Sequence, residues 1–222
     1  MSAFLLKIIA IISMVFDHVG AVFFPSAIWL RAIGRLTMPI MAYFAAVGFE
    51  KTKSVPKYLL RLGVFALISE PVYYLLFNNH SNVIITIFLG VASLYAADLL
   101  KNKFKHKWIV VFPYIIACLI AISLNSDWSY SGVLFIVAFF YAKGNKIKTL
   151  LYPLPVYALF MLEFLSKGIE YFKLNMVQLT GLFALFLLCA YSGKKGMNMK
   201  YLFYIFYPLH LFIIFIIKIF IL

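Results

Sequence analysis

Long apolar runs separated by short polar clusters are the feature that most restricts how this chain can fold. A helix needs about 20 mostly apolar residues to cross a bilayer, and the chain divides into about nine such runs. Charged residues supply only 12% of the 222 residues, about half of their usual share in soluble domains. We therefore predict an all-α fold, a polytopic transmembrane helical bundle that forms one integral-membrane domain over residues 1–222. The expected spans are 4–24, 31–49, 57–77, 83–100, 108–124, 129–142, 147–166, 174–192 and 201–222.

Two of these spans, the sixth and the first, differ from the others. The sixth, 129–142, is the shortest, and it could be a tilted or re-entrant segment instead of a full crossing. The first continues to Phe24 without a small-residue cleavage pattern, so we expect it to remain as the first helix.

The formal net charge of +13 is concentrated in alternate connections. Nucleic-acid binding would need a basic face on a soluble fold, whereas these lysines lie in clusters between apolar runs. The positive-inside rule places such loops in the cytoplasm, so we expect a cytoplasmic N-terminus, an external C-terminus and contacts with anionic lipids. The loop 167–173 is expected outside. The cytoplasmic clusters are Lys51, Lys53 and Lys57; Lys101, Lys103, Lys105 and Lys107; Lys143, Lys146 and Lys148; and Lys194, Lys195 and Lys200, whereas the connection Asn78 to Asn82 has no lysine.

An acid and an imidazole, Asp17 and His18, interrupt the first apolar run. Ionisable residues at membrane depth cost roughly 2.5 to 3.5 kcal/mol each to insert, and they usually face the protein interior at a functional site. We therefore interpret this pair as the centre of a catalytic or binding site. In a helix the two side chains diverge by about 100°, so they should not contact each other directly.

Lys7 precedes His18 by eleven residues, close to three helical turns, so both project from nearly the same face with roughly 16 Å of axial rise between them. A cation near the cytoplasm and a base deep in the membrane would suit a long cofactor whose phosphates stay at the cytoplasmic side. Lys7 could equally be an ordinary lysine that extends to the membrane surface from a helix end.

Asp17 shares its helical stripe with small residues, which permit close approach of another helix. Its expected partners are Arg31 and Arg35, one turn apart at the start of the second run. Two arginines at this spacing repel each other unless an anion lies between them. Asp17 would supply one anion and a ligand phosphate another, or the cluster could be a purely structural pairing of two helices.

Three further residues are candidates for the surroundings of the site. Glu70 precedes Pro71, which should loosen the third helix and expose carbonyl groups. Glu70 would then act as a second counter-ion to the arginines or as a proton acceptor. Tyr207 and His210 lie one turn apart in the last run on either side of Pro208, so the phenol and the imidazole share a face. A buried histidine that only satisfies a hydrogen bond is the alternative.

Small and polar residues form a stripe on the fourth run, which favours close helix packing over a cavity wall. No metal site is predicted, because the sequence lacks pairs of histidines, or of histidine and glutamate, at metal-ligand spacing. Phosphate-binding glycine loops and serine-nucleophile motifs are also missing from the sequence. The residues of the stripe are Asn82, Thr86, Gly90, Ser93 and Ala97.

At these residues the sequence resembles the TraX family of bacterial membrane proteins. The resemblance spans nearly the whole chain and is most specific in the first three helices. The segments that carry it are 6–10, 17–21, 29–31, Gly34, Arg35, Pro39, 58–62, 65–70 and 203–210.

The resemblance implies an activity. The founding member of the family is associated with N-terminal acetylation of conjugative pilin, and the family is similar to transmembrane acyltransferases that pass acetyl groups from cytoplasmic acetyl-CoA to extracytoplasmic sugars. In that group a basic residue, ten intervening residues and a histidine form a motif, which Lys7 and His18 match. Arg31 and Arg35 match arginines that recur there near the start of the second helix.

We therefore expect a multi-pass protein of the bacterial cytoplasmic membrane that uses acetyl-CoA. His18 would be the general base or a transient acyl carrier, supported by Asp17. Lys7, Arg31 and Arg35 would bind the cofactor or the developing oxyanion. The acceptor would be a pilin-like peptide or a surface glycan. The residues expected around the substrate are Glu70, Tyr207 and His210.

Two other classes of function also fit the sequence. The intramembrane charges could form the proton or anion relay of a small transporter or channel. They could instead pair with a helix of another protein, as in a membrane assembly factor.

Overall fold

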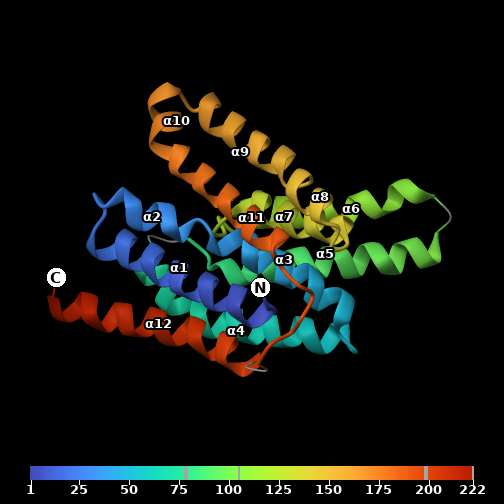
Figure 1. Ribbon diagram of the computed structural model, residues 1–222, viewed down its shortest axis with the longest axis horizontal. Coiled ribbons are helices and arrows are strands. Elements are labelled where there is room, and N and C mark those ends of the chain that lie inside the picture. The colour runs from blue at the N-terminus through green and yellow to red at the C-terminus, as the bar shows by residue number, and fades with distance from the viewer. Residues whose placement is uncertain (78–79, 105, 198–199, 222) are drawn as a thin grey trace. The chain divides into compact units, whose positions relative to one another are not determined.

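The computed structural model describes residues 1–77, 80–104, 106–197 and 200–221 (Figure 1). Within these ranges the chain is helical and contains no strand beyond one isolated bridge, Ser81 to Ser126, so the all-α prediction is confirmed for them. Of the residues named above, Asn78 and Lys105 lie outside the described residues, as does the end of the last predicted span.

In the ranges that the structure describes, fourteen helical elements follow one another. The first part contains α1 (Ala3–Phe23), α2 (Ile28–Gly34), α3 (Thr37–Lys51), α4 (Val55–Leu76) and α5 (Val83–Lys103). The second part contains η1 (Lys107–Val110), α6 (Val111–Ser123), α7 (Ser129–Ala142), α8 (Lys146–Leu151), α9 (Leu154–Ser166), α10 (Ile169–Asn175), η2 (Met176–Leu182), α11 (Phe183–Cys189) and α12 (Lys200–Ile221).

Among the described residues, seven helical stretches are long and apolar enough to cross a membrane, as expected of a multi-pass membrane protein. They are Ala3–Phe23, Ile28–Lys51, Val55–Leu76, Val83–Lys103, Lys146–Ser166, Ile169–Cys189 and Leu202–Ile221. The fifth and sixth predicted spans correspond to shorter apolar helices, Trp108–Ser123 and Ser129–Ala142. The latter extends over about 21 Å, less than the roughly 30 Å of a hydrocarbon core. The count of nine and the cytoplasmic N-terminus stay predictions.

The structure corrects the predicted loop 167–173. This stretch is not a loop, because α10 begins at Ile169 and only a short turn separates it from α9. The third predicted helix continues through Pro71 to Leu76 as α4, and the exposure of carbonyl groups by Pro71 stays a prediction.

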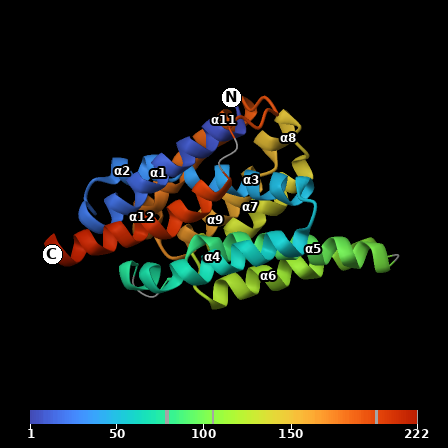
Figure 2. The same cartoon turned by 90° about the horizontal axis from the view of Figure 1, so that it is seen from below.

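The chain forms two compact units. The first consists of Met1–Met41 and Ala142–Leu222. In it α1 and α12 lie side by side, blue and red in Figures 1 and 2. The Lys7 Nζ atom lies over the Phe203 ring at 5.2 Å, and His18 contacts His210 further along both helices, so the two helices run parallel. This parallel direction is expected for seven and for nine crossings, because after an odd number of crossings the first and last helices cross the membrane in the same direction.

The beginning of α1 is held by the segment that follows α11. The Met1 amino group donates to the Ala190 carbonyl at 2.6 Å. The Ala3 and Phe4 amides donate to the carbonyls of Lys194 and Lys195 at 2.9 and 3.1 Å. These bonds satisfy N–H groups that a helix leaves without an internal acceptor, and they fix the entry of α1 into the unit.

The second unit, Ala42–Tyr141, contains α4 to α7. Its core includes a cluster of small and branched side chains, Leu89 from α5, Ala117 and Ala121 from α6, and Val133 from α7. The predicted small-residue stripe of α5 is buried along its length, and a Cβ atom at Gly90 would meet Ile136 Cδ1 at 2.5 Å. Close packing, the favoured interpretation of this stripe, is confirmed.

Candidate functional site

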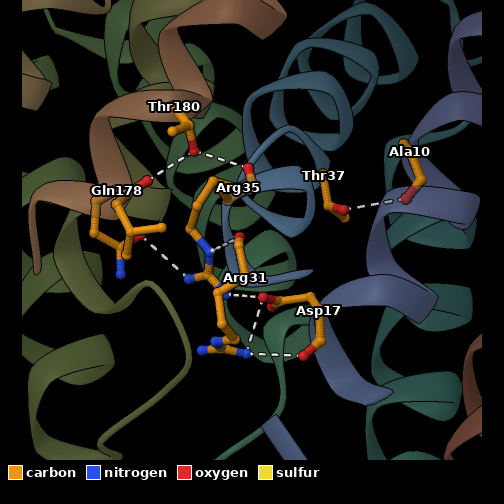
Figure 3. Close-up of polar contacts among 9 residues, drawn as sticks. Ala10, Asp17, Arg31, Arg35, Thr37, Gln178 and Thr180 are labelled. Carbon is orange, nitrogen blue, oxygen red and sulfur yellow. Dashed lines mark hydrogen bonds and ion pairs between the residues drawn. The ribbon is translucent and has the colours of Figure 1, made fainter. Parts of the chain in front are cut away.

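The predicted contact of Asp17 with both arginines is present in the first unit (Figure 3). One carboxylate oxygen, Oδ1, accepts from Arg31 Nη1 at 2.8 Å and from Arg35 Nη2. Arg31 Nη1 also donates to the Asp17 backbone carbonyl at 3.0 Å. The carboxylate therefore lies between two guanidiniums that would otherwise repel each other.

Exposure differs between the two arginine side chains. Arg35 is 6% exposed and Arg31 is 33% exposed, while the Asp17 side chain is 13% exposed. A buried charge is tolerated when it is paired and hydrogen-bonded. Arg35 thus belongs to the interior of the protein, and Arg31 is the guanidinium with more surface available to a ligand.

Gly34 allows this arrangement, because it sits where α2 meets Asp17. A Cβ atom at position 34 would overlap the Cβ, Cγ and Oδ1 atoms of Asp17. Thr37, at the start of α3, adds a second link, since its hydroxyl donates to the Ala10 carbonyl of α1 at 3.1 Å (Figure 3). The turn between α2 and α3 therefore brings Arg35 directly against α1.

The sequence analysis missed Gln178 and Thr180, which complete the surroundings of Arg35. Gln178 Oε1 accepts from Arg35 Nη1 at 3.2 Å. The Thr180 hydroxyl lies 2.8 Å from the Ala32 carbonyl and 2.7 Å from that of Val177 (Figure 3). A signal was present, because glutamine and threonine stand out in an apolar run, but their partners could not be read from spacing.

These two residues belong to η2, a seven-residue 3₁₀ segment between α10 and α11. Such runs are uncommon at this length, and a 3₁₀ stretch inside a helix often accompanies a functional position. Gly181 fits the close approach, since a Cβ there would lie 3.0 Å from the Arg35 carbonyl oxygen and 2.5 Å from the Tyr157 hydroxyl. The interrupted helix thus presents polar groups to the arginine.

His18 contacts His210, a pairing that the sequence analysis did not predict. Both side chains are buried, and His18 Nδ1 lies 2.8 Å from His210 Nε2. The planes of the two rings are nearly parallel, at 8°, and the ring centroids are 5.1 Å apart. The buried Tyr207 ring approaches both imidazoles edge-on, at centroid distances of 6.4 Å from His18 and 5.4 Å from His210. The three candidates Tyr207, His210 and His18 therefore form one cluster.

Lys7 lies at the other end of the same face of α1, as the eleven-residue spacing predicts, and its ammonium group contacts the Phe203 ring. Lys195, in the segment after α11, is close enough to interact electrostatically with it. Lys7 is therefore associated with a second cation near the start of α1.

Glu70 lies on α4 in the second unit. Its Oε2 atom accepts from the Asn82 backbone N–H at 3.0 Å and from the Asn82 side-chain amide. Asn82 in turn caps α5, its Oδ1 atom accepting from the Ile84 N–H at 2.9 Å. This carboxylate thus stabilises the start of α5. Its suggested contact with the arginines stays a prediction.

In the part of the chain that the structure describes, no group of three or more His, Cys, Asp or Glu side chains could hold a metal ion. The polar groups brought together are two imidazoles, a phenol, a carboxylate, two guanidiniums and an amide. They can accept a proton, bind an anion and stabilise a developing negative charge.

Comparison with known proteins identifies relatives over most of the chain. The model of the TraX protein family matches residues 2–218. A probable fimbrial assembly protein, FimC, of Dichelobacter nodosus is 33% identical over 174 residues, which cover 72% of this chain and 71% of the relative. An uncharacterized protein of Rickettsia prowazekii is 26% identical over 219 residues, covering 89% of this chain and 83% of that protein. No solved structure matches the chain. The resemblance noted in the sequence is thus confirmed, and the protein belongs to the TraX family.

Proposed function

We propose that the protein is a membrane acyltransferase that moves an acetyl group from cytoplasmic acetyl-CoA to an acceptor presented at or beyond the membrane. The observation that supports this most is the position of His18, a buried imidazole three helical turns beyond Lys7 on the same face of α1. His18 is the base, and Lys7 is the cation that attracts the phosphates of the cofactor.

In the proposed reaction, His18 and Arg31 have different roles. A hydroxyl or amine of the acceptor attacks the thioester carbonyl carbon while His18 takes its proton, and the carbon–sulfur bond then breaks to release the CoA thiolate. Negative charge develops on the carbonyl oxygen before that bond breaks. Arg31, the more exposed guanidinium of the cluster, stabilises this charge, because Asp17 holds it in place as a preorganised donor for a developing oxyanion.

Asp17 and Arg35 stabilise the geometry of the site without contacting the substrate. Their mutual contact and the bond from Arg35 to Gln178 hold α1, α2 and η2 together. Binding geometry within about 1 Å affects rates strongly, so this support contributes to catalysis without contact with the substrate.

The relative from Dichelobacter nodosus, named as a probable fimbrial assembly protein, supports a fimbrial or pilus subunit as the acceptor. A surface glycan or another exported peptide is the alternative acceptor within the same reaction class.

The experiment compares exported peptides and surface polymers by mass spectrometry in cells that carry the wild-type protein, His18→Ala, His106→Ala or no protein. Wild type should add acetyl groups, and His18→Ala should lower the rate by about 10²-fold or more, as expected for loss of a general base. His106→Ala is the matched control, because His106 is exposed and makes no side-chain capping bond. Full acetylation by a correctly inserted His18→Ala variant would remove His18 from the mechanism.

A second candidate is an assembly factor without enzymatic activity, which the name of the same relative favours. Such a factor would co-purify with a fimbrial subunit in fixed stoichiometry, and neither His18→Ala nor depletion of acetyl-CoA would change the assembly of fimbriae.

A further inference from the structure

The hydrogen bonds of His18 and His210 indicate which of their ring nitrogens carry protons. His210 Nδ1 lies 2.9 Å from the Phe206 carbonyl oxygen of its own helix. A carbonyl oxygen can only accept, so Nδ1 of His210 carries a proton. A neutral imidazole carries one ring proton, and Nε2 of His210 is therefore an acceptor.

The state of His18 follows from that of His210. His18 Nδ1 is 2.8 Å from His210 Nε2, and one of the two nitrogens must donate. Because Nε2 of His210 accepts, Nδ1 of His18 carries the proton. The opposite arrangement would set the lone pair of His210 Nδ1 against the lone pairs of the Phe206 carbonyl and forfeit that buried hydrogen bond.

We infer that His210 is a positioning residue that holds His18 in the Nδ1–H tautomer, so that Nε2 of His18 is the nitrogen that takes the proton. The order of donors runs from His18 Nδ1–H to His210 Nε2, and from His210 Nδ1–H to the Phe206 carbonyl. This inference rests on the proposed function for its catalytic consequence alone. The tautomer itself is a property of the resting protein.

The pair can also distribute the charge that catalysis creates. When Nε2 of His18 takes the acceptor's proton, His18 becomes an imidazolium. Its Nδ1 proton can then move to His210 Nε2, which leaves His18 neutral and places the charge on His210. No atom or electron is gained or lost in this transfer, and every ring N–H that faces the partner ring keeps an acceptor.

The hydrogen bonds of the pair allow that transfer. An imidazolium on His210 keeps both of its ring N–H groups hydrogen-bonded, Nδ1–H to the Phe206 carbonyl and Nε2–H to His18 Nδ1.

The test reads the tautomer directly. The full-length protein, labelled with ¹⁵N in its histidine rings and held in detergent micelles or nanodiscs, contains four histidines, so each ring can be assigned from single substitutions. We expect a protonated Nδ1 and an unprotonated Nε2 for both His18 and His210, with a through-hydrogen-bond coupling between the rings. A protonated Nε2 on His18 at neutral pH would overturn the inference, whatever the activity of the protein.

Two variants separate positioning from packing. His210→Phe keeps an aromatic ring but removes the acceptor, so His18 should lose its single tautomer. Its kcat should fall by about 10² to 10⁴, the upper figure being the effect of the wrong histidine tautomer in serine proteases. In His210→Gln the amide oxygen can accept from His18 Nδ1, and kcat should stay within about tenfold of wild type.

The pH profile and the spectra give independent outcomes. His210→Gln cannot take the relayed proton, so its pH–rate profile should shift while the His18 tautomer stays as in wild type. If His210→Phe left the ¹⁵N signals of His18 unchanged, His210 would be a packing residue only. The expected tautomer in a wild-type protein that transfers no acetyl group would support the positioning role and contradict the proposed function.

Discussion

Replacing Asp17 by asparagine tests how much of the stability of the first unit depends on one carboxylate, whose side chain is 13% exposed. The substitution keeps the shape of the side chain but removes the charge that Arg31 and Arg35 both contact. At about 4 Å and an effective dielectric constant of about 20, one such ion pair is worth roughly 4 kcal/mol before desolvation is counted. Breaking a buried pair from one side typically costs about 3 to 5 kcal/mol, and we expect Asp17→Asn to fall in that range.

A double-mutant cycle with Arg35→Gln isolates the pair. Asp17→Asn leaves the buried Arg35 without its anion, and Arg35→Gln leaves Asp17 without one of its two cations. The double variant removes both charges. The double variant should therefore be less destabilised than the sum of the single effects, by about 1 to 3 kcal/mol. Unfolding by SDS in mixed micelles can be followed by tryptophan fluorescence, since Trp29 lies in α2, the helix that also carries Arg31.

Glu163→Gln is the matched control. Glu163 Oε1 pairs with Lys167 Nζ at 2.6 Å, a shorter distance than that from Arg31 to Asp17, but the two side chains are 33% and 48% exposed. An exposed pair of this kind contributes about 0 to 1 kcal/mol. If Asp17→Asn cost no more than Glu163→Gln, or if the cycle were additive, the Asp17 cluster would contribute no more to stability than an exposed ion pair.

Two further predictions concern packing around Asp17 and Arg35. Gly34→Ala should destabilise the protein by about 1 to 3 kcal/mol in the same assay, because its Cβ overlaps Asp17. Gly63→Ala should be neutral or stabilising by up to about 1 kcal/mol, because its Cβ meets only Phe88 at 3.7 Å. Gln178→Leu should remove the bond to Arg35 Nη1 and lower stability by about 1 to 3 kcal/mol. Gln178→Glu should recover part of this loss, since a carboxylate also accepts from the guanidinium.

The outcomes that would contradict these predictions are distinct. Equal stability of Gly34→Ala and Gly63→Ala would mean that α1 and α2 can separate at no cost. A Gln178→Leu variant as stable as wild type would show that η2 does not support Arg35.

Much of the architecture could be predicted from local properties of the sequence. A membrane helix satisfies all its backbone hydrogen bonds within one segment, so a run of apolar residues is enough to predict it. The pairing of Asp17 with Arg31 and Arg35 was predictable for a related reason. Two cations one turn apart need an anion, and the neighbouring helix offered one within a short connection.

The interruptions of the helices were harder to predict. Composition does not distinguish a continuous span from α10, η2 and α11, because the same apolar residues suit both. The 3₁₀ segment forms where Thr180 donates to the Ala32 carbonyl and Gln178 accepts from Arg35, and these are contacts with another helix.

Asp17 and His18 differ in how far their contacts could be predicted from the sequence. Helical geometry correctly separates the two side chains and points Asp17 toward the arginines, because the angle between adjacent residues is a property of a single helix. The contact of His18 with His210 joins residues 192 positions apart. This contact depends on the parallel packing of α1 and α12 and on their register. The register is determined jointly by the side chains along the whole interface. The sequence by itself therefore determined that the first helix carries an acid and a base, and only the tertiary structure decided which partner holds the base.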